Sequence, residues 1–435
     1  MSLFIGAMRK HVDGKKELTN HSELVVIQAE KRVYLPLINM GSTSVEVLVK
    51  ENDKVFVGTK VACRNDNFMV PFFSSVSGKV IGTEKRVHSS GKDVDHLIIE
   101  NDGKYTQKFD IKPLDWEKAT NEELVDFMMN SGMVGCGGAG FPTYIKYKFA
   151  KDIHTLIING VECEPYITAD YREMDTQPSE LLLGVKAMKK MCGANVAYIA
   201  IKKSKKELIA KISELVSGVE GIEVKMVPDV YPMGWERTLV YEIAKKRYDK
   251  LPSEIGIIVN NATTAICFAK ALTSGQPIIS KVVTFSGNAL VKNANVEVPI
   301  GVPVSEVISK LGGYGKEEGY VIAGGPMMGT AIKSDEFVIH AYANAVTVLE
   351  TKPQDEMACL RCGRCSDYCP AGIQPVRIKQ AHEIKDVEMV KNLGTDLCIE
   401  CGMCSMVCPS HIAITESIRK AKRALMLANQ KAGGK

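Results

Sequence analysis

The apolar residues of the N-terminal region come in short runs. Between residues 24 and 100 they alternate with polar residues or form runs of a few residues, as at 33–38 and 45–49. Turn-forming residues such as Asn52 and Asp53 separate these runs. Short apolar or alternating runs broken by turn residues are typical of β-strands. The pattern therefore predicts a β-rich N-terminal region.

From residue 119 onward, segments with the apolar spacing of helices alternate with segments that have the apolar spacing of strands. Thr120 is placed to cap a helix over 119–130, with Glu123 three residues later as in a capping box. Further helices are expected near 179–191, 204–216 and 237–247, and strands at 154–158, 196–201, 223–227 and 256–259. Alternation of strands and helices predicts an open α/β sheet.

Polar and acidic residues follow three of these strands. They lie at 159–164, 228–236 and 260–264 and include Asn, Glu, Gly and Thr. In open α/β sheets ligands bind outside the carboxyl ends of the strands. We therefore expect these three segments to share one binding crevice.

A glycine-rich segment runs from Gly135 to Gly140, and Phe141 follows it. It formally contains G-x-G-x-x-G, but it follows a predicted helix, whereas a Rossmann fingerprint follows a strand. Glycines still allow backbone N–H groups to approach a flat or anionic ligand closely, and Lys146 supplies a cation nearby. A ligand-binding loop and an ordinary turn both remain open.

The stretch from 281 to 330 changes character again. Apolar strand-like runs flank a short predicted helix at 304–311, and glycines cluster at 324–329. This predicts a small β-rich module whose glycine segment faces a ligand or forms a simple turn.

Two cysteine runs near the C-terminus share the spacing C-x2-C-x2-C-x3-C-P. The first holds Cys359, Cys362, Cys365 and Cys369, and the second holds Cys398, Cys401, Cys404 and Cys408. This spacing ligates [4Fe–4S] clusters, and the fourth cysteine of each run normally reaches the other cluster. We therefore predict one cluster on Cys359, Cys362, Cys365 and Cys408, and a second on Cys398, Cys401, Cys404 and Cys369.

Other uses of these cysteines fit less well. Zinc sites use two pairs of ligands rather than two runs of four. The first residues lack the apolar core and cleavage site of a signal peptide, so we expect a cytoplasmic protein with reduced thiols. The five remaining cysteines are expected to be packed thiols: Cys63, Cys136, Cys163, Cys192 and Cys267.

Composition narrows the function further. The net charge of +4 is too small to argue for nucleic acid, and no apolar run is long enough for a transmembrane helix. Basic runs at 202–206 and 419–423 are expected to be solvated helix faces, or to dock an acidic redox partner or a membrane surface. The length of 435 residues suggests about three or four domains.

Several separated motifs resemble the flavin- and NADH-binding loops of the flavoprotein subunit of respiratory complex I. They are Gly137-Gly-Ala-Gly-Phe-Pro-Thr143 with Lys146, Asn159-Gly-Val-Glu-Cys-Glu-Pro165, Tyr231-Pro-Met-Gly-Trp-Glu236 and Asn260-Asn261-Ala-Thr263. The N-terminal region resembles a barrel-sandwich (lipoyl-like) domain, although residues 64–68 lack the Lys that would carry a lipoyl group. Together with the cysteine runs, this order is similar to that of the RnfC family, the C subunits of Rnf complexes.

The resemblance implies a multidomain α/β and α+β protein. We expect a barrel-sandwich domain, a Rossmann-like FMN/NADH domain, a β-grasp (SLBB) module and an α-helical, ferredoxin-like domain with two [4Fe–4S] clusters. The corresponding ranges are 1–112, 113–278, 279–345 and 346–435.

The resemblance also implies cofactor-binding residues, and no side chain is expected to act as a nucleophile. The residues expected to hold FMN are Gly137, Gly138, Gly140, Phe141 and Lys146, with Asn260 and Asn261 at its phosphate. Those expected around the nicotinamide are Asn159, Glu162, Glu164, Tyr231, Gly234 and Glu236.

The implied activity is electron transfer between NAD(H), FMN and the two clusters. It would couple ferredoxin oxidation to NAD+ reduction and ion translocation at the cytoplasmic face of a membrane. The implied partners are a ferredoxin-like subunit and integral membrane subunits. One departure is that residues 5–12 lack the Gly-Gly-(Val/Ile)-His-Pro-Pro stretch frequent in this family. A related reductase that serves cobalamin or proline reductase, or a non-catalytic electron wire, therefore remains an alternative.

Overall fold

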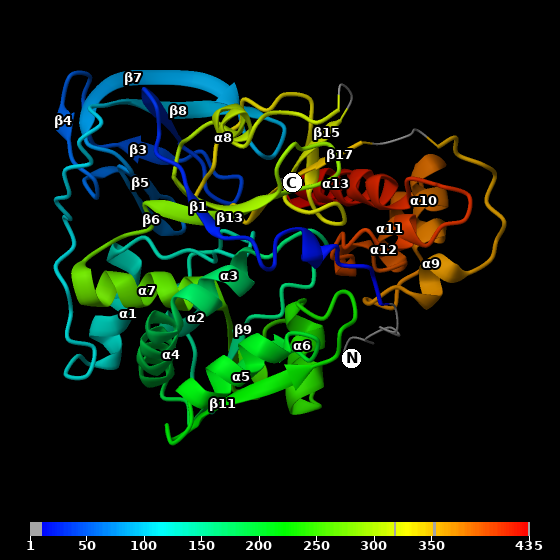
Figure 1. The fold of residues 1–435 in the computed structure, drawn as a ribbon. Helices are drawn as coiled ribbons and strands as arrows, with labels where there is room; N and C mark the ends of the chain where they lie inside the picture. The colour runs from blue at the N-terminus through cyan, green and yellow to red at the C-terminus, as the bar shows by residue number, and fades with distance from the viewer. Residues whose placement is uncertain (1–10, 317–318, 351–353, 434–435) are drawn as a thin grey trace.

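The structure, a computed structural model, describes residues 11–316, 319–350 and 354–433 (Figure 1). The unusual N-terminal sequence at 5–10 lies outside these residues. The chain forms two N-terminal β-sheets, a parallel α/β sheet, a mixed six-stranded sheet and a helical C-terminal domain. No helix in the described ranges combines the length and apolar character needed to cross a membrane.

The N-terminal region forms two antiparallel sheets, as the alternating pattern predicts. One sheet has the order β2 (Arg32–Pro36), β8 (Asp93–Asn101), β7 (Gly78–Val87) and β4 (Lys54–Val55). The other has the order β3 (Val45–Val47), β5 (Lys60–Asn65) and β6 (Met69–Phe73). Buried side chains such as Val33, Val61 and Ile99 fill this region. The predicted barrel-sandwich architecture is confirmed.

The α/β sheet has the order β11 (Ile222–Val227), β10 (Val196–Lys202), β9 (Thr155–Asn159) and β12 (Ile257–Asn261), with all pairs parallel. Its helices are α1 (Asn121–Asn130), α2 (Ile145–Lys148), α3 (Ala169–Thr176), α4 (Pro178–Cys192), α5 (Lys206–Leu215), α6 (Glu236–Ala244) and α7 (Ala262–Ser274). The predicted capping box of α1 is present, since Thr120 and Glu123 bond each other's backbone N–H groups. The apolar pattern of the sequence did not predict α3, a short polar helix in which Asp170 and Glu173 are buried.

The third sheet has the order β1 (Leu24–Val26), β14 (Ala294–Pro299), β13 (Ser280–Ser286), β17 (Ala345–Leu349), β15 (Tyr320–Ala323) and β16 (Thr330–Ile332). Helix α8 (Val304–Lys310) accompanies it. β1 pairs in parallel with β14, so the N-terminal region contributes an edge strand here. β17 also continues past the boundary expected at 345. The β-grasp identity of this module and the domain limits stay predictions.

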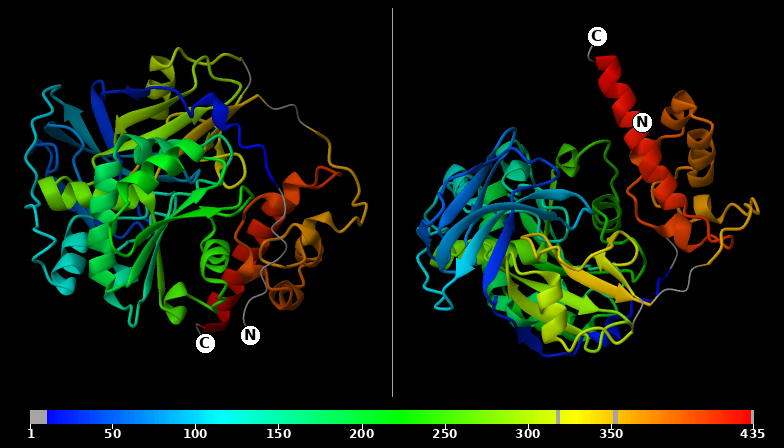
Figure 2. Two further views of the ribbon diagram at one scale, coloured as in Figure 1. Left: turned by 60° about the horizontal axis from the view of Figure 1, so that its bottom comes forward. Right: turned by 90° about the horizontal axis from the view of Figure 1, so that it is seen from above.

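The C-terminal domain consists of α9 (Arg364–Asp367), α10 (Pro375–Glu383), α11 (Val387–Asn392), α12 (Met403–Met406) and α13 (Ile414–Gly433). The short helices α9 and α12 each begin within a cysteine run. Gly363 and Gly402 precede them with φ of 76° and 77°, a left-handed conformation that glycine adopts without strain. The two runs therefore share one local fold. Figure 2 shows this domain at the side of the molecule, with α10, α11 and α12 packed against the long α13.

Candidate functional site

The carboxyl ends of β9 and β12 lie side by side. Asn159 and Asn261 are partners in the parallel register, so the loops that follow both strands leave the sheet together. The Asn159 side-chain amide donates to the carbonyl oxygen of Gly234 at 2.9 Å, which ties in the third predicted segment. The three segments expected at one crevice therefore meet at one edge of the sheet.

The glycine loop packs against the N-terminus of α7. A Cβ on Gly137 would lie 2.9 Å from the side-chain nitrogen of Asn261, so a larger residue would displace the Asn261 amide. The backbone N–H of Cys136 donates to the Thr264 hydroxyl at 2.9 Å. Asn261 caps α7 by accepting from the N–H of Thr264. The loop and a helix N-terminus, which attracts anions, therefore adjoin each other.

The far end of the glycine loop faces the N-terminal sheets. The side-chain amide of Asn39 donates to the Gly140 carbonyl oxygen at 2.9 Å. The Phe141 ring meets the Phe68 ring edge-on, with centroids 5.9 Å apart. Gly140 itself has φ of +63°, and a Cβ there would contact the ring of Tyr342. Gly140 and Phe141 thus hold the glycine loop between the N-terminal sheets and the segment that contains Tyr342.

Asn260 and Asn261 point to opposite faces of β12. Asn260 is buried, and its amide donates to the Tyr147 hydroxyl. Lys146 donates to the Val259 carbonyl oxygen at 2.6 Å and lies 3.7 Å from a carboxylate oxygen of Glu236. Burial lowers the pKa of Lys146. Lys146 and Asn261 therefore adjoin the crevice, whereas the buried Asn260 amide binds Tyr147 on the opposite face of β12.

The Glu164 carboxylate reaches the glycine turn after β15. One of its oxygens accepts the N–H groups of Met327 at 2.7 Å and Met328 at 3.0 Å. Its other oxygen lies 3.2 Å from the Tyr231 hydroxyl. A Cβ on Gly325 would come within 2.2 Å of Glu164 Cγ, so a larger residue there would displace the Glu164 side chain. Burial of Glu164 raises the pKa of its carboxyl.

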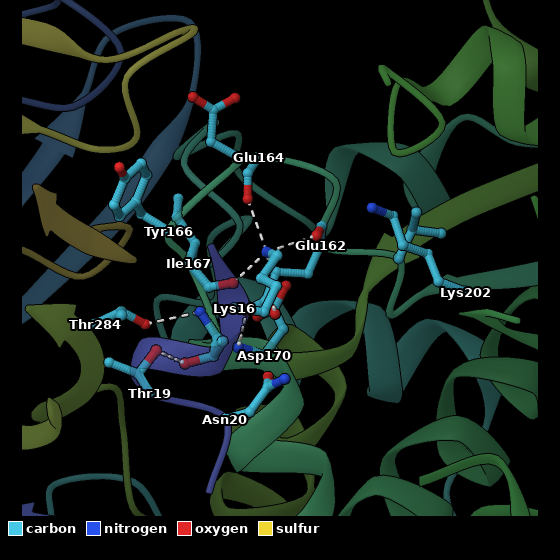
Figure 3. A network of polar contacts seen from close by, with 12 residues as sticks. Lys16, Thr19, Asn20, Glu162, Glu164, Tyr166, Ile167, Asp170, Lys202 and Thr284 are labelled. Carbon is cyan, nitrogen blue, oxygen red and sulfur yellow. Dashed lines mark hydrogen bonds and ion pairs between the residues drawn. The ribbon is translucent and has the colours of Figure 1, made fainter. Parts of the chain in front are cut away.

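Lys16 holds the backbone of the loop between β9 and α3, called the acidic loop here because it contains Glu162 and Glu164 (Figure 3). Lys16 Nζ donates to the carbonyl oxygens of Glu162 at 3.0 Å, Glu164 at 2.7 Å and Ile167. It also lies 3.8 Å from Glu162 Oε2, which has no hydrogen-bond partner among the described residues. Burial raises the pKa of Glu162 and lowers the pKa of Lys16. The loop between β9 and α3 is therefore tied to a segment far away in sequence.

The sequence did not point to Lys16 or to Asp170. Asp170 accepts from the Asn261 amide at 2.7 Å and from the Thr263 hydroxyl at 2.7 Å, and its N–H donates to Glu162. It thereby links the acidic loop to the start of α7. No motif marks either residue, because a Lys or an Asp in a polar segment is common on protein surfaces.

The eight cysteines of the two runs surround two cavities. The inner cavity is lined by Cys398, Cys401, Cys404 and Cys369. The outer cavity is lined by Cys359, Cys362, Cys365 and Cys408. Each cavity thus has three cysteines of one run and the fourth cysteine of the other, which is the grouping expected for crossed ligation.

This donor set fits iron–sulfur clusters. Each thiolate of a [4Fe–4S] cluster binds a different iron, so the sulfurs must surround a volume rather than converge on one ion. Among the residues that the structure describes, no three His, Cys, Asp or Glu side chains converge closely enough for a single metal ion. The inner cysteines are mostly buried, with Cys401 and Cys404 each 8% exposed, whereas Cys359 and Cys362 are exposed.

The inner cavity adjoins the crevice at the carboxyl ends of β9 and β12. The Tyr231 hydroxyl donates to the Cys401 carbonyl oxygen at 2.7 Å. A Cβ on Gly402 would lie 2.4 Å from the Met327 carbonyl oxygen. Tyr231, Cys401 and Met403 form one buried apolar cluster. Tyr231 and the 325–328 turn thus connect the Glu164 loop to the inner cysteines.

Three protein-family models match the chain. They are the Nuo51 FMN-binding domain over residues 128–270, the RnfC barrel sandwich hybrid domain over 9–104 and the 4Fe-4S dicluster domain over 352–409. The first covers the glycine loop, the acidic loop and Asn261, and the third covers both cysteine runs. The residues described above fit both cofactors, because the glycine loop leaves a cradle at a helix N-terminus and the cysteines line two cavities.

Curated relatives align over most of the chain. The C subunit of the Na(+)-translocating ferredoxin:NAD(+) oxidoreductase complex of Acetobacterium woodii is 33% identical over 85% of each chain. The C subunit of the ion-translocating oxidoreductase complex of Rhodobacter capsulatus is 34% identical over 95% of this chain and 82% of its own. A crystal structure of NAD+-reducing [NiFe]-hydrogenase in the H2-reduced state matches 73% of this chain and 63% of its own at 18% identity, with a TM-score of 0.49. This chain belongs to the RnfC family, the C subunits of ion-translocating oxidoreductase complexes.

Proposed function

We propose that this chain is the NADH-handling subunit of an Rnf-type membrane complex. It passes electrons between NAD(H), FMN and two [4Fe–4S] clusters, and so couples ferredoxin oxidation to NAD+ reduction and ion translocation. The relatives in Acetobacterium woodii and Clostridium ljungdahlii are named for Na+- and proton-translocating ferredoxin:NAD+ oxidoreductase complexes. The observation that carries the proposal is the direct contact between the nucleotide crevice and the inner cysteine cavity through Tyr231 and Cys401.

The glycine loop, Lys146 and the start of α7 are proposed to hold FMN. Gly137 and Gly138 leave room for a close approach of the backbone, and Asn261 presents the N-terminus of α7. Lys146 places a positive charge beside the same strand end. Asn260 acts through Tyr147 and keeps the end of β12 in place. FMN, when bound, exchanges two electrons with a nicotinamide and single electrons with an iron–sulfur cluster.

The acidic loop and the Tyr231 segment are proposed to shape the nicotinamide pocket. Glu164 is held by two backbone N–H groups and lies next to the Tyr231 hydroxyl. Asn159 binds the Gly234 carbonyl and so sets the distance between the two loops. Glu162 is oriented by the Asp170 N–H. These side chains bind and orient, and none needs to form a covalent bond with the nicotinamide.

The cysteine assignment is proposed as crossed ligation. Cys398, Cys401, Cys404 and Cys369 hold the inner cluster, and Cys359, Cys362, Cys365 and Cys408 hold the outer cluster. The lining of the two cavities supports this grouping. Because the inner cavity adjoins Tyr231 and the outer cavity opens to solvent, the cysteines of the inner cavity would hold the cluster nearer the flavin site, and those of the outer cavity would hold the cluster nearer the solvent. The two clusters would supply one-electron transfer between these two ends.

The proposed partners are a ferredoxin-like subunit and the integral membrane subunits of the complex. The chain would then sit at the cytoplasmic face of the membrane. Support comes from the names of the relatives, which are subunits of ion-translocating complexes.

The experiment is a reduction in the absence of partners. The protein is purified anaerobically and reconstituted with iron, sulfide and FMN, and visible spectra are recorded after NADH is added. We expect the flavin band and the broad cluster absorbance to bleach together. Reduction by dithionite but not by NADH would contradict the NADH-handling role and favour an electron wire.

A further inference from the structure

The two cluster cavities differ in what surrounds them. The inner cavity lies against the nucleotide loops, and Glu400 on its wall is paired with Lys422 at 2.7 Å and Arg419 at 3.1 Å. Two of the four cations of the basic run on α13, Arg419 and Lys422, are therefore engaged at this wall, where Lys422 also donates to the Cys398 carbonyl oxygen. The outer cavity instead opens to solvent, with Cys359 and Cys362 exposed.

Three arginines line the outer cavity, and all three are exposed. They are Arg361, Arg364 and Arg377. The residues that line this cavity include no Asp or Glu. Asp367 on α9 is close in sequence but does not line the cavity. Within the described parts of the chain, no ion pair that meets a 4.0 Å limit involves these arginines. The mouth of the cavity is therefore a positive surface without an acidic partner in the described part of this chain.

Apolar side chains accompany the arginines. Leu360 lines the same cavity and is 66% exposed, and Met357 in the preceding segment is 54% exposed. Arginine and methionine are enriched at protein interfaces, and exposed apolar groups near a polar rim mark interaction sites. A purely electrostatic role toward a cluster would not require Leu360 and Met357 to face solvent.

We propose that the mouth of the outer cavity, formed by Arg361, Arg364, Arg377 and Leu360 with Met357 in the adjoining segment, docks an acidic one-electron carrier protein of the iron–sulfur type. This proposal rests on the proposed function, because it supplies the far end of the electron path. One electron passes from the reduced carrier to the oxidised outer cluster, or in the reverse direction, and no bond forms or breaks. Opposite charges speed the encounter and orient the two centres for transfer.

The test measures binding rather than turnover. The holoprotein is titrated with an oxidised, acidic two-[4Fe–4S] ferredoxin by calorimetry, without NADH, from about 20 mM to about 200 mM salt. The variant carries Arg361→Gln, Arg364→Gln and Arg377→Gln. The matched control carries Lys391→Gln, Lys420→Gln and Arg423→Gln, three exposed cations of the same domain with the same loss of charge.

We expect the variant to bind at least about tenfold more weakly at low salt, with a difference that shrinks as salt rises, and the control to stay within about twofold of the wild type. Iron content and the cluster spectrum of each protein are measured first. If the triple variant fails to hold its clusters, the single variant Arg377→Gln is used instead, because Arg377 lies outside the cysteine runs. Its control is Lys391→Gln. We expect Arg377→Gln to weaken ferredoxin binding about twofold to fivefold.

An unchanged Kd would overturn the proposal. A shifted midpoint potential of the outer cluster with unchanged Kd would assign the arginines to charge compensation of the cluster and would also overturn it. So would arginine-dependent binding to vesicles of anionic phospholipid with no binding to the ferredoxin. NADH is absent from the titration, so the measured Kd for ferredoxin does not depend on the nicotinamide site. Wild-type protein that binds ferredoxin but is not reduced by NADH would refute the proposed function and leave the docking proposal intact.

Discussion

The Tyr231 hydroxyl donates a hydrogen bond to the Cys401 carbonyl oxygen at 2.7 Å, while it lies 3.2 Å from a carboxylate oxygen of Glu164. One buried side chain therefore touches both the acidic loop and a cysteine run. Tyr231 is 2% exposed, so water does not replace either contact. The position of the C-terminal domain against the crevice at the ends of β9 and β12 depends in part on this one group.

Replacing Tyr231 with Phe removes this contact and keeps the ring. A net contribution of about 1 kcal/mol for a buried hydrogen bond corresponds to about fivefold faster local opening. We expect amide hydrogen exchange in residues 398–408 to accelerate about fivefold, with FMN content unchanged. Tyr314→Phe, which breaks a contact with Asp335 away from the interface, is the control. Equal exchange in the two variants would show that Tyr231 does not hold the domains together.

Glu164→Gln tests the acidic loop. The amide can still accept from Met327 and Met328, but it removes the negative charge beside Tyr231. Hydrogen bonds to a charged acceptor are about twice as strong as neutral ones. We expect NADH-linked dye reduction to fall about tenfold in kcat/KM, with cluster content intact. Glu223→Gln, an exposed change on β11, should have no effect, and unchanged kinetics in Glu164→Gln would remove this residue from the site.

The elements that local sequence determines were predictable. The capping box of α1 depends on two residues three positions apart, and the cysteine runs depend on spacing alone. The four strands of the α/β sheet and the longer helices between them likewise followed from apolar periodicity. The approach of Gly137 to Asn261 was implied only by the family resemblance, which assigns both residues to FMN, because a sequence pattern carries no distance between loops.

The missed features depend on long-range packing. Lys16 reaches the Glu162 carbonyl from 146 residues earlier, and nothing in its neighbours marks it. β1 lies next to the predicted barrel-sandwich strands in sequence but pairs with β14 in space. α3 is polar, yet it buries Asp170 and Glu173 because the start of α7 and its neighbours surround it. Such contacts cannot be read from a local pattern.

Lys16→Met tests the lysine under the acidic loop. The change leaves three buried carbonyl oxygens and the Glu162 carboxylate without their cation, and an unsatisfied buried group costs about 1–3 kcal/mol. We expect amide exchange in residues 162–168 to accelerate about thirtyfold, which corresponds to about 2 kcal/mol. Lys15→Met is the control, since Lys15 pairs with the exposed Asp13. An acidic loop that is equally protected in both variants would contradict this role.

Buried histidines make the fold sensitive to acid. Burial lowers the pKa of His88 to about 4, and it also lowers the pKa of His96 and His340. The unfolded chain binds these protons near pH 6.5 and the folded chain does not, so the stabilisation is complete above pH 6.5 and is lost as pH falls toward 4. For His88 the loss between pH 6.5 and pH 5 is about 1.5 kcal/mol.

His88→Gln keeps a polar partner for Ser90 and removes the titration. Thermal unfolding of the variant should therefore depend less steeply on pH between 6.5 and 5 than that of the wild type. His21→Gln, an exposed histidine, should leave the slope unchanged. A wild-type slope in His88→Gln would show that this residue does not take up a proton on unfolding.

Cys408→Ala and Cys369→Ala distinguish crossed from uncrossed ligation. Cys408 follows Cys404 in the second run, but it lines the outer cavity with Cys359, Cys362 and Cys365. Cys369 lines the inner cavity with the second run. We expect Cys408→Ala to damage the outer cluster and to leave the inner one reducible through the flavin. Cys369→Ala should damage the inner cluster and so block reduction of the outer cluster by NADH.

EPR of the dithionite-reduced and NADH-reduced proteins separates these outcomes, and Cys192→Ala controls for the loss of a thiol. Dithionite should reduce the one intact cluster in either variant, whereas NADH should reduce it only in Cys408→Ala. The difference arises because only the outer cluster can be lost without interrupting the path from the flavin. If instead NADH reduces the remaining cluster in Cys369→Ala and not in Cys408→Ala, each fourth cysteine serves its own run, and the grouping that the cavities indicate is wrong.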